Sequence, residues 1–311
     1  MNLRMLENTL GIKVDVDTDR GTRCGVPNLL KLLKRHSISA TFLFSLGPDN
    51  TGRAIKRIFR PGFFKKVSRT SVVSTYGLRT LMNGVLLPAP HIGRRNEDKI
   101  IQAHIDGHEV GVHCYDHIKW QDELFKMDAE ETSEELSKAL NEFSRIFGVR
   151  ALTAGSAGWQ ANANSLKAYD DAAFEYASDA RGTSAFYPEI DGRLFKTMQI
   201  PTTLPTLDEL LGRPEYPDDM IADHYLSLIK PDRLNILTVH AEMEGMAHLT
   251  WFDDFLNKLK QADIKFSRLD KIASNLKAQS DNVPVCHLYQ GEVDGRTGSL
   301  AMQGQSKMNR V

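Results

Sequence analysis

Two histidines four residues apart, His113 and His117, are the first residues whose types and spacing suggest chemistry. They follow the apolar run from Glu109 to Val112, which predicts a buried strand with the pair at its C-terminal end. Imidazoles at positions i and i+4 can face a common point in a helical turn, as metal-binding pairs do. The glutamate that follows the first histidine of a metalloprotease helix is absent, and ten histidines in 311 residues also produce this spacing by chance. The pair alone leaves both interpretations open.

Asp15-Val16-Asp17 is the second feature, at the end of an alternating stretch that begins at Gly11 and predicts a first strand. Alternation points the two carboxylates to the same side. Two close anions repel each other unless one binds a cation and the other holds or shares a proton. One of these aspartates with the two histidines makes three ligands, the arrangement of a hydrolytic metal site with an open position. Taken alone, the aspartates also fit a solvated strand end or a helix N-cap.

Two later strands repeat the pattern of a polar residue after a buried run. His240 ends the run that begins at Leu234, and Asp179 follows Tyr176 to Ser178. Either residue alone also fits a buried, hydrogen-bonded core position. In α/β folds the chemistry gathers at the C-terminal ends of the strands. The strand ends predicted here carry Asp15, Asp17, His113, Asp179 and His240.

The elements that must position these residues alternate between strand and helix. Pro27 and the leucines after it predict a helix that leads into a strand at 38–44. Asp128 and Glu131 fit a capping box for a helix that ends at Gly148. We expect a polar loop at 18–25. Other helices are expected at about 96–105, 162–173, 217–230 and 248–262, and other strands near 176, 196–200, 234–239 and 265–267. The alternation predicts one α/β domain with a mainly parallel sheet, closed or nearly closed.

The charge balance separates one segment from the rest. Residues 50–95 contain ten Lys or Arg and no Asp or Glu, so the remainder holds 29 basic and 40 acidic residues although the formal net charge is only −1. This block interrupts the strand–helix alternation and is interpreted as an insertion. The three cysteines are widely spaced and predict neither a disulfide framework nor a thiolate metal site. The polar N-terminus and the lack of a long apolar run predict neither a cleaved signal peptide nor a membrane span.

Five short motifs, taken in order, resemble the polysaccharide deacetylase (NodB-homology) family. They are Asp15-Val16-Asp17, His113-Cys114-Tyr115-Asp116-His117, Gly155-Ser156-Ala157-Gly158-Trp159, Ser178-Asp179 and Leu237-Thr238-Val239-His240. Their order and approximate spacing agree from about residue 10 to 270. The resemblance implies a distorted, incomplete (β/α) barrel over residues 1–278, with 50–95 as a basic, membrane-facing insertion. Residues 279–311 are polar and Gly-rich, and we expect them to form a poorly ordered tail.

The resemblance also implies roles for the motif residues. Asp17, His113 and His117 would hold a divalent metal, Asp15 would be the general base, and His240 would protonate the departing amine. One carboxylate with two imidazoles suits zinc but also cobalt, manganese or nickel. Asp179, Trp159 and Leu237 would support the site. The third motif lacks the family's Arg, which pairs with the later Asp and steadies the base, and we expect Arg181 to take its place.

The runs 155–159, 176–182 and 240–245 resemble one branch of that family. Its members remove the formyl group from 4-deoxy-4-formamido-L-arabinose on phosphoundecaprenol, in the lipid A modification that gives polymyxin resistance in Gram-negative bacteria. Glu242 and Glu244 lie just past His240, where they would either receive the new ammonium of such a product or be ordinary loop carboxylates. The alternatives are a deacetylase of another lipid-linked or soluble amido sugar, or an inactive sugar-lipid binding protein. Asp-x-Asp also occurs in glycosyltransferases, but these need no paired histidines.

A substrate carried on undecaprenyl phosphate stays in the inner membrane, which gives the basic block an interpretation. Each Lys or Arg near an anionic leaflet contributes about 1 kcal/mol of binding free energy, and exposed aromatic rings enter the interface. We therefore expect peripheral binding to the cytoplasmic side of the inner membrane. A solvated basic loop is the alternative, and a nucleic-acid partner is not expected because no other feature matches such a module. The residues expected to contact the membrane are Arg57, Arg60, Phe63, Phe64, Lys65 and Lys66.

Overall fold

The computed structural model describes residues 8–54, 79–278 and 283–306. A parallel sheet of seven strands forms the centre, paired in the order β5-β4-β3-β2-β1-β8, with β9 pairing to the first residues of β1. The end strands β5 and β8 are not neighbours in this order, so the sheet is open. The predicted incomplete (β/α) barrel is therefore confirmed. The strands are β1 (Thr9–Val16), β2 (Thr41–Ser45), β3 (Glu109–Cys114), β4 (Thr153–Ala154), β5 (Tyr176–Ala177), β8 (Asn235–His240) and β9 (Lys265–Ser267).

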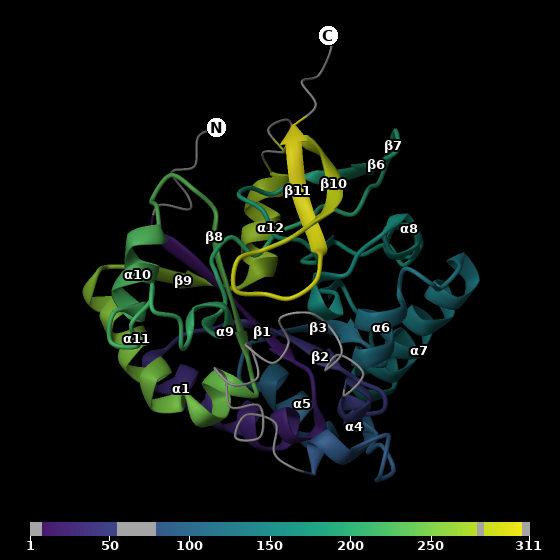
Figure 1. Ribbon diagram of the computed structural model, residues 1–311, viewed down its shortest axis with the longest axis horizontal. Coiled ribbons are helices and arrows are strands. Elements are labelled where there is room, and N and C mark those ends of the chain that lie inside the picture. The colour runs from purple at the N-terminus through teal and green to yellow at the C-terminus, as the bar shows by residue number, and fades with distance from the viewer. Residues whose placement is uncertain (1–7, 55–78, 279–282, 307–311) are drawn as a thin grey trace.

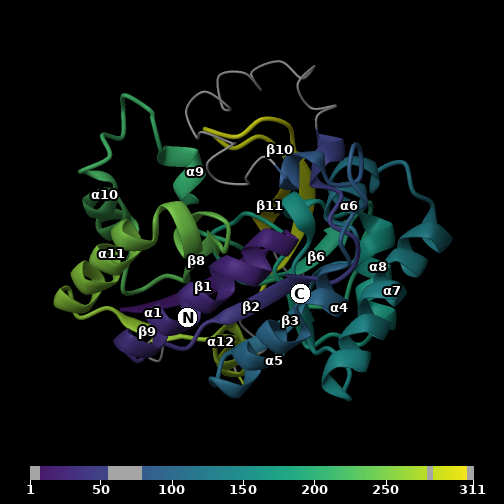
Figure 2. The ribbon, with the colours of Figure 1, turned by 90° about the horizontal axis from the view of Figure 1, so that it is seen from below.

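Helices pack side by side around the curled sheet in the order α10, α11, α1, α5, α7 and α8. α10 and α11 lie at one end of this row and α7 and α8 at the other (Figures 1 and 2). The predicted capping box of α7 is present, because Asp128 accepts from the backbone N–H of Glu131 and Glu131 accepts from that of Asp128. No helix in the described ranges is long and apolar enough to cross a membrane. The helices are α1 (Val26–His36), α4 (Ile92–Arg95), α5 (Glu97–Ile105), α6 (His117–Glu123), α7 (Ala129–Phe147), α8 (Ala163–Asp171), α9 (Leu207–Leu210), α10 (Ile221–Leu228), α11 (Leu249–Gln261) and α12 (Leu269–Lys277).

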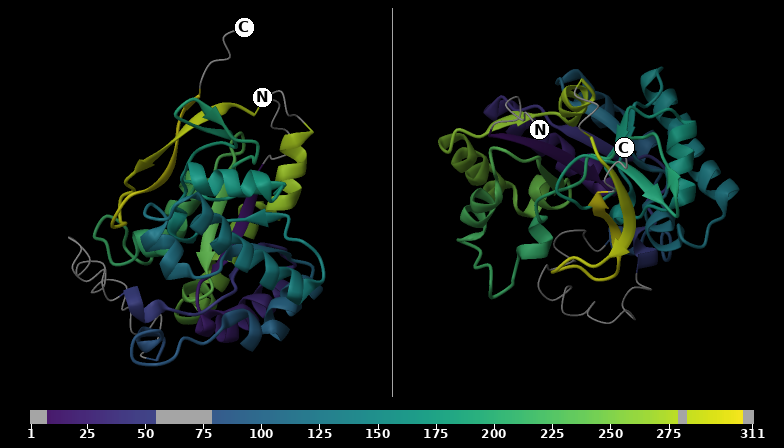
Figure 3. Two further views of the ribbon diagram at one scale, coloured as in Figure 1. Left: turned by 90° about the vertical axis from the view of Figure 1, so that its right-hand side faces the viewer. Right: turned by 90° about the horizontal axis from the view of Figure 1, so that it is seen from above.

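The expectation of a poorly ordered tail is wrong for residues 283–306. They form the antiparallel hairpin of β10 (Val285–Gly291) and β11 (Leu300–Ser306), which joins β6 (Tyr187–Ile190) and β7 (Arg193–Leu194) in a second, four-stranded sheet. Figure 3 shows this hairpin as a layer of its own beside the barrel. The polar composition misled the prediction because only a few apolar side chains hold the hairpin, and these are buried: Leu288, Leu300 and Ala301.

Two local predictions also need correction. The loop expected at 18–25 contains a short π-helix, η2 (Gly21–Gly25), packed against a second one, η6 (Met243–Ala247). The strand expected at 196–200 is replaced by isolated bridges of Gln199 with Ala177 and Phe186. The backbone of Gln199 gains its partners from other parts of the chain, which local composition cannot reveal.

Part of the basic insertion is described. Its visible parts include a 3₁₀ turn, η4 (Thr80–Met82), and α4, and Asp49 fastens the segment to the barrel by accepting hydrogen bonds from Asn83 and Thr51. Val85 and Leu86 are exposed, to 54% and 76%. The six residues expected to contact a membrane, Arg57, Arg60, Phe63, Phe64, Lys65 and Lys66, lie outside the described residues.

Candidate active site

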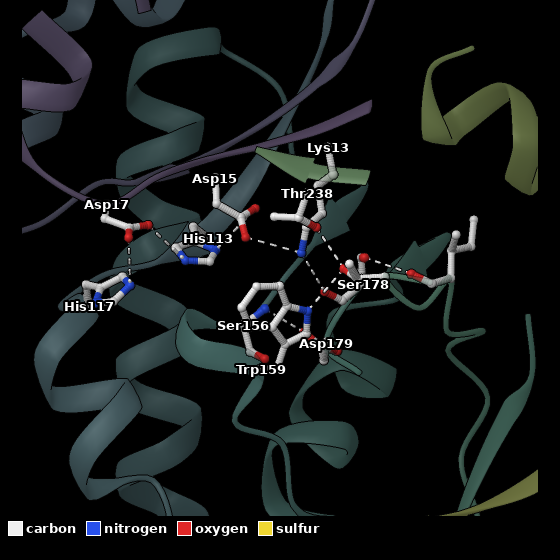
Figure 4. Close-up of polar contacts among 12 residues, drawn as sticks. Lys13, Asp15, Asp17, His113, His117, Ser156, Trp159, Ser178, Asp179 and Thr238 are labelled. Carbon is white, nitrogen blue, oxygen red and sulfur yellow. Dashed lines mark hydrogen bonds and ion pairs between the residues drawn. The ribbon is translucent and has the colours of Figure 1, made fainter. Parts of the chain in front are cut away.

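Asp17, His113 and His117 meet at the C-terminal edge of the sheet (Figure 4). Asp17 lies one residue past β1, His113 lies near the end of β3, and His117 is the first residue of α6. The Nε2 atoms of His113 and His117 lie 3.4 Å from Oδ1 and Oδ2 of Asp17, respectively. The histidines therefore converge as predicted, but across a strand end and a helix start rather than within one helical turn. Asp116 between them caps α6 by accepting from two backbone N–H groups.

The electrostatics of this triad fit a bound cation. Burial opposes ionisation of Asp17, but the nearby His117, His113 and His240 outweigh it and hold its pKa far below the ordinary value. Burial likewise opposes a charge on His113, yet Asp15 and Asp17 raise its pKa. Oδ1 of Asp17 and Nδ1 of His113 are buried without a hydrogen-bond partner among the described residues. Unpaired buried donors and acceptors are costly, and a carboxylate with two imidazoles is a common donor set for a divalent metal.

Asp15 and His240 lie side by side because β1 and β8 pair in parallel with these two residues in register. Asp15 is buried, and its Oδ1 lies 3.9 Å from Nδ1 of His113. His240 is partly exposed, and its ring contacts that of Trp159 edge-on at 6.3 Å between centroids. The fold thus brings a carboxylate and an imidazole next to the triad. Such a set has the components of metal-assisted hydrolysis with a general base and a general acid.

Glu242 and Glu244 are buried and hold the loops that carry the site. Oε1 of Glu242 accepts from the backbone N–H of Asp17 and from both the N–H and the hydroxyl of Thr18, at 3.1, 2.9 and 2.7 Å. Oε2 of Glu244 accepts from the backbone N–H of His240 at 2.9 Å. Burial raises the pKa of Glu242 to about 8, with a contribution from Asp17, and that of Glu244 to about 7. These contacts fit the loop-carboxylate interpretation better than capture of a product ammonium.

Asp179 holds the third motif in place through a hydrogen bond to its backbone. It is fully buried and accepts from the backbone N–H of Ser156 at 2.7 Å and from the side chain of Gln199 at 2.8 Å. Leu237 belongs to the main hydrophobic core. Strand alternation places Leu237 on the opposite face of β8 from His240, so its support is packing.

Trp159 lies in the 3₁₀ turn η5 (Ala157–Trp159) and is buried against the site. Its indole N–H donates to the hydroxyl of Thr202 at 3.1 Å. Three cations lie over its ring, Arg296 at 4.5 Å, Lys13 at 5.1 Å and Arg181 at 5.5 Å from the centroid. Arg296 comes from the β10–β11 hairpin, so the segment expected to be poorly ordered reaches the surroundings of the site.

The expectation that Arg181 steadies the base is wrong. Its guanidinium donates to Glu209 at 2.6 Å and to the carbonyl of Leu204 at 3.0 Å. The cation that contacts Asp15 is Lys13, whose Nζ lies 3.2 Å from Oδ2. Sequence reasoning missed Lys13, although a lysine two residues before Asp15 in an otherwise apolar strand was an available signal.

The chain belongs to the polysaccharide deacetylase family, whose model matches residues 11–177. It is 38% identical over 294 residues, 94% of both chains, to the "probable 4-deoxy-4-formamido-L-arabinose-phosphoundecaprenol deformylase ArnD" of Shewanella sediminis (strain HAW-EB3). It is 32% identical to the protein of the same description from Wigglesworthia glossinidia brevipalpis, covering 91% of this chain and 98% of that one. The fold agrees with the crystal structure of a presumed polysaccharide deacetylase from Mycobacterium smegmatis, with a TM-score of 0.63, 14% identity, and 93% and 96% of the two chains covered.

Proposed function

We propose that this protein hydrolyses the formamide of 4-deoxy-4-formamido-L-arabinose carried on undecaprenyl phosphate, releasing formate and the aminoarabinose lipid. The main support for this proposal is that Asp15 and His240 lie in register on neighbouring strands, beside the cluster of Asp17, His113 and His117. The identity of 38% and 32% to the two relatives, over nearly the whole chain, supports this choice of substrate.

Asp17, His113 and His117 would hold a divalent cation, for which zinc, cobalt, manganese and nickel are the candidates. When bound, such a cation supplies Lewis acidity, which polarises an amide carbonyl and makes water more acidic. The chain supplies the proton transfers. Asp15 accepts the proton of the attacking water, and His240 gives a proton to the departing nitrogen, so that one amide and one water become one carboxylic acid and one amine.

The protein would meet its substrate at the cytoplasmic face of the inner membrane. The ten cations of residues 50–95 and the exposed Val85 and Leu86 support this location. Cationic side chains attract anionic lipid, and exposed aliphatic side chains lose water when they enter the headgroup region.

Formate release from the purified lipid-linked sugar tests the activity. We expect release by the wild-type protein, its loss after chelation, and its return when one of the four metals is added. If the protein releases acetate from the acetamido analogue but no formate from the formamido sugar, it is a deacetylase instead. Binding of the lipid without any release would indicate a binding protein.

Co-sedimentation with vesicles that contain anionic lipid tests the location. Neutralising Arg57, Arg60, Lys65 and Lys66 together, or changing Leu86→Asp, should reduce the bound fraction. Leu152→Asp is a matched control, because Leu152 is also exposed (49%) but lies outside the basic block. If the quadruple variant sediments like the wild type, the basic block does not bind the membrane.

A further inference from the structure

Lys13 is a lysine whose side chain lies wholly inside the barrel, with 0% of its surface exposed. Asp15 follows two residues later and lies on the same face of β1. The neighbouring strands β2 and β8 both pair with β1 at Lys13. Lysine is almost never fully buried without a partner, because an ammonium removed from water loses several kcal/mol of hydration. Its environment must therefore replace that hydration.

Three groups surround the Lys13 ammonium (Figure 4). Its Nζ lies 3.2 Å from Oδ2 of Asp15, donates to the carbonyl of Ser178 at 3.2 Å, and lies 5.1 Å from the centre of the Trp159 ring. An ammonium has three donors, and an aromatic face attracts a cation within about 6 Å. The Lys13 ammonium is thus contacted by Asp15 on β1, by Ser178 just after β5, and by Trp159 in η5. These three contacts leave its Nζ little freedom to move.

The two oxygens of Asp15 differ as a result. Oδ2 contacts the ammonium, whereas Oδ1 is buried without a hydrogen-bond partner in the described part of the chain and lies 3.9 Å from Nδ1 of His113. A carboxylate held at one oxygen cannot rotate freely, so the other oxygen keeps a fixed direction. That direction is toward the histidine side of the site.

We propose that Lys13 is a positioning residue, which fixes the Asp15 carboxylate so that Oδ1 is the atom that receives the proton of the attacking water. This inference rests on the proposed function for the identity of the reaction. Arg181 is excluded from this role by its own contacts with Glu209 and Leu204. Misplacing a catalytic group by about 1 Å costs on the order of 10²-fold in rate, so a small rotation of Asp15 should be visible in turnover.

The test compares Lys13→Met, which keeps the length of the side chain but removes the charge, with Lys13→Arg, which restores a cation. We expect Lys13→Met to lower kcat by about 100-fold while KM and the affinity for added metal change by less than about 3-fold. Lys13→Arg should recover to within about 10-fold of the wild-type kcat. Lys258→Met is the control. Lys258 lies on α11, outside the proposed site, and this change also removes a lysine from an ion pair, the one with Asp223.

A crystal structure of metal-free Lys13→Met supplies a readout independent of activity, in which we expect the Asp15 carboxylate to have turned. If Lys13→Met does not fold, Lys13→Gln keeps a donor for the Ser178 carbonyl and serves the same comparison. An unchanged kcat, a loss confined to KM or metal affinity, or no recovery in folded Lys13→Arg would each overturn the proposal. Absence of formate release by the wild type would instead reject the proposed function, and the Asp15 conformation would still report on Lys13.

Discussion

Gly21→Ala should damage the proposed metal site without changing any of its proposed ligands. A methyl group at Gly21 would lie 1.8 Å from Oε1 of Glu242, and contacts below 3.0 Å essentially never occur. The Glu242 carboxyl would have to retreat by about 1.5 Å to restore ordinary contact. Gly21 is the first residue of η2 and does not adopt a positive φ, so backbone strain is not the cause.

The expected magnitude follows from the hydrogen bonds of that oxygen. Oε1 of Glu242 accepts three hydrogen bonds from Asp17 and Thr18, each worth about 1 kcal/mol net. Alanine offsets up to about 1 kcal/mol by its helix propensity, so the free energy of unfolding should fall by about 2 kcal/mol. Because the backbone of Asp17 loses its anchor, metal affinity should fall by about 10–100-fold.

Urea denaturation and calorimetric metal titration measure these two effects, and a double-mutant cycle isolates the cause. In Gly21→Ala/Glu242→Ala the clash is gone, so the double variant should be no worse than Glu242→Ala alone. Wild-type metal affinity in Gly21→Ala, or additive losses in the double variant, would refute the reasoning.

Three further predictions follow from the same structure. Asp15→Asn and His240→Ala should bind metal but lose about 10²–10⁴-fold in turnover, whereas His113→Ala should lose both, and activity retained in Asp15→Asn would reject the assigned base. Burial raises the pKa of Glu109 from 4.5 to about 7, so the folded state keeps a proton that the unfolded state releases, and stability should fall by about 3 kcal/mol as pH rises from 4.5 through 7. Glu242 and Glu244, whose pKa values are also raised, to about 8 and about 7, add to the fall in stability over the same pH range. Glu109→Gln should therefore remove only the Glu109 contribution of about 3 kcal/mol in urea titrations at several pH values, and an unchanged slope would exclude this group as a source. Glu209→Gln leaves Arg181 and Arg296 without their buried carboxylate and should lower the free energy of unfolding by about 3 kcal/mol. A decrease of less than about 1 kcal/mol would show that water or other groups replace the carboxylate.

Much of the site was already present in the sequence. Strand alternation placed Asp15 and Asp17 on one face, and the position of His113 at the end of an apolar run identified its strand. The capping box and Gly148 marked both ends of α7. These features are local, because period, caps and turns depend on neighbours within a few residues, and so a single sequence contains them.

The tertiary structure decided what contacts what. Lys13 and Asp15 share one face of β1, a proximity that strand alternation alone implies. Only the tertiary structure places Ser178 and Trp159 around the Lys13 ammonium and directs Arg181 to Glu209 instead. Glu242 became an anchor of the Asp17 loop because η6 packs on η2, more than 200 residues away in sequence. The C-terminal segment became a hairpin because β6 offered it an edge to pair with. Each outcome depends on partners brought together only when the chain closes around its core, and no local pattern encodes such a pairing.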